Sequence, residues 1–79
     1  MNNTMHPTAQ KCLAYIQSYT AAYGFPPTIR EIADAVGVAS TSTVEHHLRE
    51  LECTGHIARR YNAARAIRVL RPTPWEVAP

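Results

Sequence analysis

Apolar residues recur every three or four positions in three stretches of the chain, which predicts three amphipathic helices. The first helix is expected over 9–23, with Thr8 as its N-cap and Gly24 as the residue that ends it. Its apolar stripe consists of Leu13, Ile16, Tyr19 or Thr20, and Tyr23. Phe25-Pro26-Pro27 then forces an extended connection, because a residue that precedes proline is pushed out of the helical region.

A capping box predicts where the second helix begins. The hydroxyl of Thr28 can accept the N–H of the residue three positions on, and Glu31 can reach back to the cap. Gly37 supplies the left-handed residue that stops this helix. The apolar positions between these two signals are Ile29, Ile32, Ala33 and Val36. A short helix that ends on glycine and leads into a longer helix is typical of a helix-turn-helix.

The third helix is expected to begin at Ser40 or Thr41 and to end at Gly55. On a helical wheel, the core side consists of Val44, His47, Leu48 and Leu51. The opposite side consists of Ser42, His46, Arg49 and Cys53, flanked by Thr43, Glu45 and Glu50. A short, polar outer face suits a helix that reads base edges in DNA, although a solvated surface helix has the same pattern. Arg49, further along, is better placed to contact a phosphate.

Beyond Gly55 the period changes to an imperfect alternation of apolar and polar residues. This predicts short strands within 56–60 and 65–70, joined by a turn over 61–64. Three helices followed by a hairpin is the order of a winged helix-turn-helix, a mainly α fold with a small β-hairpin, expected over residues 8–70. Residues 1–7 are expected to form a flexible arm, and 71–79, which include Trp75, an extended tail.

The basic residues gather late in the chain. The net charge is only +2, which argues against a non-specific architectural binder with a large positive field. However, 57–75 contains no acidic residue, and it carries Arg59, Arg60, Arg65, Arg68 and Arg71. This asymmetry predicts one basic edge, although arginines that are simply solvated on a hairpin would give the same pattern.

Other chemistries find little support in the sequence. His46, His47, Cys53 and His56 suggest zinc, but adjacent helical residues point about 100° apart and no paired Cys-x-x-Cys accompanies them. No phosphate-binding glycine loop or nucleophile motif is present, so we expect neither an enzyme nor a cofactor. With no signal peptide or membrane-length apolar run, and with two distant cysteines, a cytoplasmic protein without a membrane partner is expected.

Residues 8–70 resemble the N-terminal DNA-binding domain of the LexA repressor family, which regulates the bacterial SOS response. The matching motifs are P-P-T-I-R-E-I-A-D-A-V-G (26–37), S-T-S-T-V-x-H-H-L-R-x-L-E (40–52), G-x-I (55–57) and R-A-I-R-V-L (65–70). The resemblance implies a winged helix-turn-helix repressor that reads a palindromic DNA operator as a dimer, in a bacterial or phage-encoded cytoplasmic protein.

The resemblance also implies roles for individual residues. Carried over by position, the base-reading residues are Ser40, Ser42, Thr43, Glu45 and His46. The resemblance implies contacts to the DNA backbone at Thr28, Arg30, Arg59 and Arg65, and we expect further ones at Thr41, Arg49 and Arg60. Hydroxyl groups can donate or accept, a glutamate can accept from the cytosine amino group, and a histidine can donate to a purine N7.

The chain departs from the family in two respects. LexA proteins continue into a self-cleaving protease domain that also supplies dimerisation, and none of its motifs occurs among these residues. An excised domain and a stand-alone small regulator of the phage or plasmid type both fit, and we expect the latter. The wing also differs, at Arg60, Tyr61, Ala63 and Ala64. The alternative function is a protein-interaction module that binds LexA, RNA polymerase or another protein through the winged helix.

Overall fold

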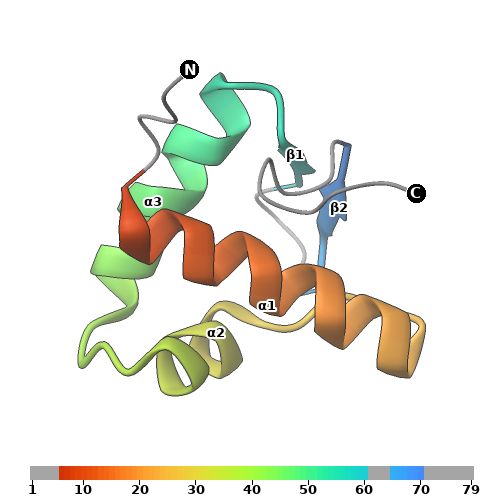
Figure 1. Cartoon of the computed structure of the whole chain (residues 1–79), viewed down its shortest axis with the longest axis horizontal. Helices are drawn as coiled ribbons and strands as arrows, with labels where there is room; N and C mark the ends of the chain where they lie inside the picture. The colour runs from red at the N-terminus through yellow and green to blue at the C-terminus, as the bar shows by residue number, and fades with distance from the viewer. Residues whose placement is uncertain (1–5, 61–64, 71–79) are drawn as a thin grey trace.

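The computed structural model describes residues 6–60 and 65–70 of the chain. In these ranges the elements follow in the order α1 (Pro7–Tyr23), α2 (Ile29–Val36), α3 (Thr41–Cys53), β1 (Ile57–Arg59) and β2 (Ile67–Val69). Helix α1 crosses the middle of the molecule and contacts both other helices as well as β2 (Figure 1). The predicted fold class, three helices followed by a small antiparallel hairpin, is therefore confirmed.

Helix α1 begins earlier than predicted. Its N-cap is His6, whose Nδ1 accepts the backbone N–H of Thr8 at 3.0 Å, so the predicted N-cap Thr8 lies inside the helix. Pro7 follows as the first helical residue, where its missing N–H costs no hydrogen bond. The predicted stripe is buried only in its first half: Tyr23 is 61% exposed, because the last turn of α1 extends away from α2 and α3 (Figure 1).

The connection from α2 to α3 forms as the local signals predict. Thr28 Oγ1 accepts the N–H of Glu31 at 3.1 Å, and the N–H of Thr28 donates to Glu31 Oε1 at 2.8 Å, which completes the capping box. Gly37 has φ 81°, a conformation that a side chain would strain, and its N–H donates to the carbonyl of Ala33 at 3.0 Å. Ser40 is the cap of α3, since its Oγ accepts the N–H of Ser42 at 3.0 Å.

The core lies between the three helices and is closed by the hairpin. Each large aliphatic side chain removed from water here contributes roughly 1.5–3 kcal/mol to stability. The largest fully buried aliphatic side chains are Leu13, Ile16, Ile32, Leu48, Leu51, Ile57 and Val44. Predicted core positions of α3 thus all point inward, including His47, which is only 6% exposed. This burial fixes the rotation of α3 and therefore which of its faces is turned outward.

The two strands pair in antiparallel register, with Ile57 opposite Val69 and Arg59 opposite Ile67. Both isoleucines point into the core, so β1 packs on α3 and β2 packs on α1. Each strand has three residues, shorter than the predicted stretches 56–60 and 65–70. The predictions for the turn at 61–64, for residues 1–5 of the arm expected at 1–7 and for the tail at 71–79 lie outside the described residues, while His6 and Pro7 of that arm cap and begin α1. No helix of the described part is long and apolar enough to span a bilayer.

Candidate nucleic-acid interface

The outer face of α3 carries a shallow polar hollow of about 330 Å³, lined by Ser42, Glu45, His46 and Arg49. These residues are spaced at i, i+3, i+4 and i+7 and therefore share one helical face. Three of the five predicted base readers line this hollow. Of the other two, Thr43 is exposed beside it, and Ser40 is exposed at the helix start, where its hydroxyl serves as the N-cap. The hollow offers hydroxyl, imidazole, carboxylate and guanidinium groups to solvent.

Glu45 is held from the hairpin by Arg59. Arg59 Nη1 donates to Glu45 Oε1 at 3.0 Å, and Nη2 donates to Oε2 at 3.4 Å. A guanidinium that meets both oxygens of a carboxylate forms a strong, directional pair. The side chain of Arg59 is 6% exposed, whereas that of Glu45 is 37% exposed. The structure thus brings a predicted phosphate contact against a predicted base reader.

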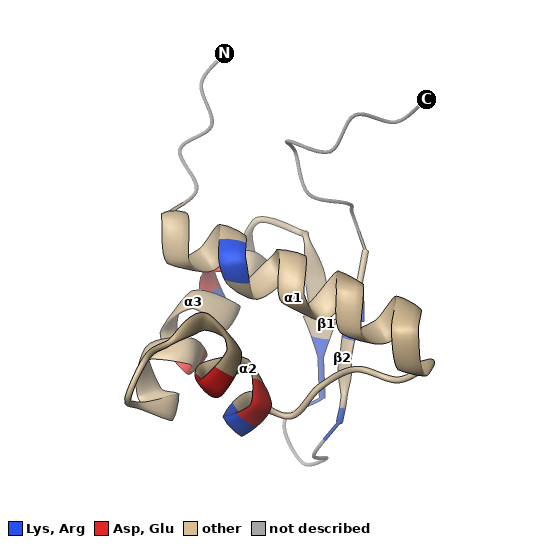
Figure 2. Ribbon diagram, turned by 60° about the horizontal axis from the view of Figure 1, so that its bottom comes forward, with Lys and Arg blue, Asp and Glu red and all other residues tan. Residues whose placement is uncertain are grey.

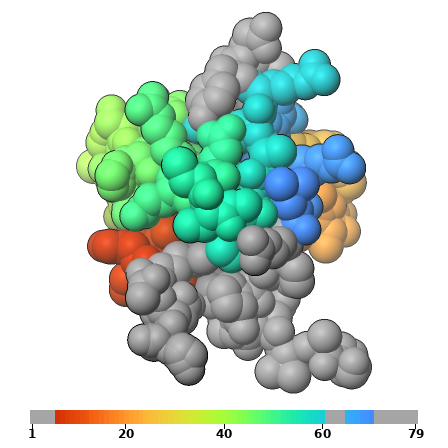
Figure 3. All heavy atoms as spheres, turned by 90° about the horizontal axis from the view of Figure 1, so that it is seen from above, coloured from red at the N-terminus to blue at the C-terminus, as the bar shows by residue number. Residues whose placement is uncertain are grey.

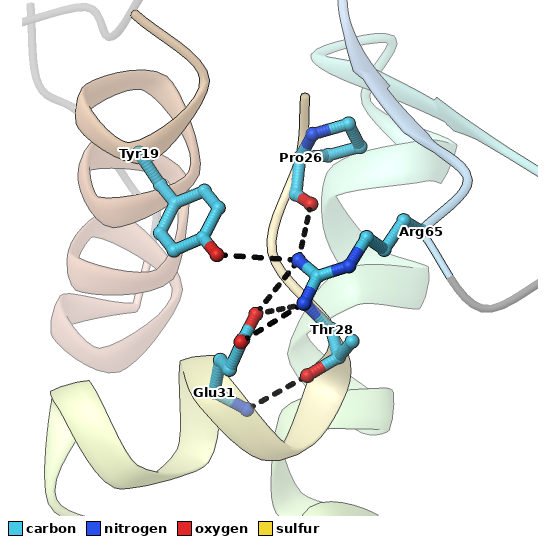
Figure 4. A network of polar contacts seen from close by, with 5 residues as sticks. All are labelled: Tyr19, Pro26, Thr28, Glu31 and Arg65. Carbon is cyan, nitrogen blue, oxygen red and sulfur yellow. Dashed lines mark hydrogen bonds and ion pairs between the residues drawn. The ribbon is translucent and has the colours of Figure 1, made fainter. Parts of the chain in front are cut away.

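Arg65 is the centre of a second polar network (Figure 4). Its Nη1 lies 3.0 Å from Glu31 Oε1, 3.0 Å from the carbonyl oxygen of Pro26 and 3.2 Å from the hydroxyl oxygen of Tyr19. Its Nη2 donates to Glu31 Oε2 at 3.0 Å. The guanidinium also lies over the rings of Tyr19 and Phe25, 5.9 and 5.1 Å from their centroids. Arg65 therefore joins α1, the Pro-Pro connection, α2 and the segment that enters β2.

This network controls the ionisation of its carboxylate. The hydrogen bonds from Arg65, followed by the backbone N–H of Thr28, lower the pKa of Glu31 to about 2. The same hydrogen bonds to Glu31 raise the pKa of Arg65. Both groups stay charged over the whole neutral range. Glu31 is accordingly both the third residue of the capping box and the carboxylate of an ion pair with the hairpin.

The remaining predicted backbone contacts are more open. Arg30, Arg49 and Arg60 are exposed, and no carboxylate among the described residues pairs with them. Thr41 is exposed in the first turn of α3, while Thr28 is half-buried with its hydroxyl in the capping box. Figure 2 shows cationic positions at the start of α2 and along both strands. In the space-filling view, α3 and the strands adjoin in one surface (Figure 3).

The histidines divide between the two sides of α3, as the wheel predicts. His47 points inward, where its Nδ1 lies 3.3 Å from Glu50 Oε1 and its ring lies 4.8 Å from that of His6. His46 is exposed on the outer face, with its ring nearly perpendicular to that of His47. His56, at the other end of the helix, places Nδ1 2.7 Å from Thr54 Oγ1. These three histidines thus lie in three different environments.

The pairing of Glu45 with Arg59 was not predicted, although the sequence contains a signal for it. Ile57 and Arg59 are two residues apart on one strand and therefore point to the same side, which is the side of the core. A charged residue on the inward side of a strand needs a partner, and an acidic residue at the edge of the packed helix is the nearest choice. A cluster of the exposed Tyr23 and Phe25 with the half-buried Tyr19 was also missed.

Comparison with known proteins identifies the family of the chain. The family model for the LexA DNA binding domain matches residues 3–66. The chain is 48% identical over 62 residues to the LexA repressor of Clavibacter sepedonicus, covering 78% of this chain and 27% of that protein. It is 51% identical over 61 residues to the LexA repressor of Halalkalibacterium halodurans, covering 77% of this chain and 30% of that protein.

A third relative extends the aligned region. The LexA repressor of Carboxydothermus hydrogenoformans is 39% identical over 69 residues, which cover 87% of this chain and 34% of that protein. The chain thus spans about a third or less of the length of the curated relatives it matches. Three helices followed by an antiparallel hairpin are consistent with a winged helix-turn-helix domain of this family. This chain belongs to the LexA DNA-binding domain family.

Proposed function

We propose that the chain is a sequence-specific, double-stranded DNA-binding transcriptional repressor of the LexA type, which lays α3 in the major groove of an operator half-site. The observation that carries this proposal is the hollow on the outer face of α3, where Ser42, Glu45, His46 and Arg49 meet. The inner face of the same helix is fixed in the core, so the outer face is presented as a rigid unit. A helix of this kind fits the width of the major groove.

The base-reading roles follow from the chemistry of each side chain. Ser42 and Thr43 carry hydroxyl groups that donate to or accept from base edges, and Ser40 adds a hydroxyl at the helix start. Glu45 accepts from a cytosine amino group, and His46 donates to a purine N7. These side chains lie in the first half of α3, which is the part of a recognition helix that reaches base edges in helix-turn-helix proteins.

Phosphate contacts would set the register of the helix on DNA. Arg30, Arg49 and Arg60 are exposed and are our first choices for this role, with the helix starts at Thr28 and Thr41 adding their N-terminal dipoles. Arg65 remains a candidate, since its side chain is 38% exposed. Arg59 is the weakest member of the set, because its side chain is only 6% exposed.

One chain of this size reads one half-site, so two copies would occupy a palindromic operator in the bacterial cytoplasm. Without contact between the copies, binding of a single chain is expected to be in the micromolar range, since the second half-site adds no affinity. Tight binding of one copy to a lone half-site would contradict this expectation. Gel-shift titrations against duplexes with one and with two half-sites measure both cases.

The function is tested by fluorescence anisotropy with a labelled palindromic SOS-type operator and a scrambled duplex at two salt concentrations. We expect a preference for the operator that persists at the higher salt, because base contacts depend less on released counterions than phosphate contacts do. Equal, salt-labile binding to both duplexes would reduce the function to phosphate attraction. Binding to neither would contradict the proposal.

A protein-interaction module is the second candidate, and one observation favours it. Tyr23 and Phe25 are 61% and 45% exposed and cluster with Tyr19, away from the hollow on α3. Aromatic residues are enriched in protein interfaces. Alanine at Ser42, Thr43 and His46 distinguishes the candidates: these changes should abolish DNA binding but leave a protein contact at the aromatic cluster intact.

A further inference from the structure

The position of Arg59 on β1 leads to a second role for the hairpin in DNA recognition. We propose that Arg59 is a positioning residue for base recognition: it holds the carboxylate of Glu45 in the orientation that reads a base, and it does not bind phosphate. This inference rests on the proposed function. It changes the expected role of Arg59 from a contact with the DNA backbone to a contribution to base specificity.

The geometry fixes Arg59 at both ends. Its backbone lies opposite Ile67 in the strand register, and the next N–H, of Arg60, donates to the carbonyl of Ala66 at 3.0 Å. Its side chain lies on the same side of the strand as the fully buried Ile57 and is itself 6% exposed. At the far end, both terminal nitrogens meet Glu45, at 3.0 and 3.4 Å. A side chain enclosed in this way has little reach toward a DNA backbone.

Glu45 is held but still open. Its side chain is 37% exposed and lines the hollow on α3. A carboxylate has about four lone-pair positions, so two hydrogen bonds from Arg59 leave others for a base amino group. A glutamate fixed before binding loses less rotamer freedom when the base arrives. The positive partner also offsets the repulsion between a carboxylate and nearby phosphates.

The ion-pair partner of Glu45 is not the one that its position on α3 would favour. Glu45 and Arg49 are four residues apart on α3, the spacing at which a glutamate and a following arginine normally pair on a helix surface. Among the described side chains, however, the ion pair of Glu45 is with Arg59, fourteen residues away, and Arg49 makes none. Arg49 is thereby left at the edge of the hollow for phosphate. In this proposal, Arg59 orients the carboxylate of Glu45 and Arg49 contacts a phosphate.

The experiment selects bound DNA from a pool of duplexes with a randomised central segment, using the wild-type chain and four variants, with a fifth in reserve. Arg59→Met keeps the aliphatic stem but removes the charge. Glu45→Ala and the double variant Glu45→Ala/Arg59→Met report on coupling, and Arg49→Ala is the matched control for loss of an arginine. Arg59→Lys, which keeps the charge but not the two parallel hydrogen bonds, serves if the methionine variant does not fold. Thermal unfolding checks each variant.

We expect the wild type to enrich a motif, and Arg59→Met to lose preference at the same base pair of the half-site as Glu45→Ala. One mismatched base pair in a site lowers affinity roughly 5- to 150-fold, so the loss should lie in this range. The double variant should discriminate no worse than Glu45→Ala alone. Arg49→Ala should keep the motif, bind all sequences more weakly, and lower the slope of log affinity against log salt by about 1.

Different failures have different meanings. If Arg59→Met keeps the motif, weakens binding to all sequences and lowers the salt slope as Arg49→Ala does, Arg59 is a phosphate contact and the inference is wrong. If Glu45→Ala keeps the motif, Glu45 reads no base and the inference also fails. If the wild-type chain enriches no motif at all, the proposed function itself fails, and the inference fails with it.

Discussion

The hairpin is tied to the helices by two arginine–glutamate pairs that look alike but have different surroundings. Arg65 meets Glu31 with both partners about equally exposed, at 38% and 35%. Arg59 meets Glu45 with the guanidinium enclosed at 6% and the carboxylate open at 37%. In the first pair, carboxylate oxygen Oε1 also accepts the capping-box N–H of Thr28, whereas in the second the carboxylate lines the hollow of α3.

The difference shows that the surroundings of the carboxylate determine what an ion pair does. Glu31 also accepts the N–H of Thr28, and its partner Arg65 also bonds Tyr19 and Pro26, so this pair joins four segments of the fold. Glu45 has the same kind of partner but faces outward from α3. We therefore interpret the Glu31 pair as structural and the Glu45 pair as a device that presents one side chain to DNA.

Removal of Arg65 should give the largest effect on stability. Arg65→Ala deletes contacts to α1, the Pro-Pro connection and α2 at once, so we expect a larger fall in Tm than for Arg59→Met. Arg68→Ala is the matched control, since Arg68 is an exposed cation on β2, three residues after Arg65. Thermal unfolding followed by circular dichroism measures the three values. Equal Tm values for Arg65→Ala and Arg68→Ala would contradict a structural role for the Arg65 network.

The N-caps of α2 and α3 should differ in how much they stabilise the fold. Thr28→Ala breaks the capping box at the Glu31 pair and should cost about 1–2 kcal/mol of the free energy of unfolding. Ser40→Ala removes a single cap bond at the start of α3 and should cost about 0.5–1 kcal/mol. Urea unfolding at neutral pH measures both. A larger loss of stability for Ser40→Ala than for Thr28→Ala would contradict this ranking of the two caps.

Acidic pH should destabilise the fold through protonation of Glu31. Its folded-state pKa of about 2 lies below the ordinary value of 4.5, so its stabilising contribution is fully present above about pH 4.5 and is lost as the pH falls through about 2. Glu31→Gln should remove this component of the pH dependence between these two values, while Glu45→Gln, the matched control, should retain it. Urea unfolding across this pH window measures the difference. Identical slopes for wild type and Glu31→Gln would contradict the assignment.

Arg59 should matter least for stability. Its partner Glu45 is more than a third exposed, and ion pairs with solvent access contribute about 1 kcal/mol or less. Arg59→Met keeps the aliphatic stem, so the free energy of unfolding should fall by no more than this amount, as urea unfolding can show. A loss of several kcal/mol would mean that the Arg59 pair is a structural element like that of Arg65, and the contrast between the pairs would disappear.

The parts of the fold that the sequence predicts are those decided by local chemistry. The Thr28–Glu31 capping box and the left-handed Gly37 need only neighbouring residues, and the inward face of α3 follows from its period. The start of α1 was misplaced because a histidine side chain, an unusual cap, takes the place expected for Thr8. Local signals of this kind fix each element but not how the elements meet.

The two ion pairs could not be predicted from local chemistry. Glu45 and Arg59 are 14 residues apart, and Glu31 and Arg65 are 34 apart, so each pair depends on where the hairpin packs against the helices. The sequence indicated correctly which α3 residues face outward. The assignment of these residues to bases or phosphates stays a prediction. The pairing of Arg59 with Glu45, which only the structure shows, changes the role that we propose for Arg59.

We expect DNA to dock on the outer face of α3 while the Arg65 network stays intact. A titration of the isotope-labelled chain with an operator-type duplex, followed by amide chemical shifts, tests it most directly. We predict the largest changes at Ser42, Thr43, His46 and Arg49, with the Tyr19 and Tyr23 amides nearly unmoved. Changes confined to Tyr19, Tyr23 and Phe25, with α3 unaffected, would contradict the account and favour a contact through the aromatic cluster.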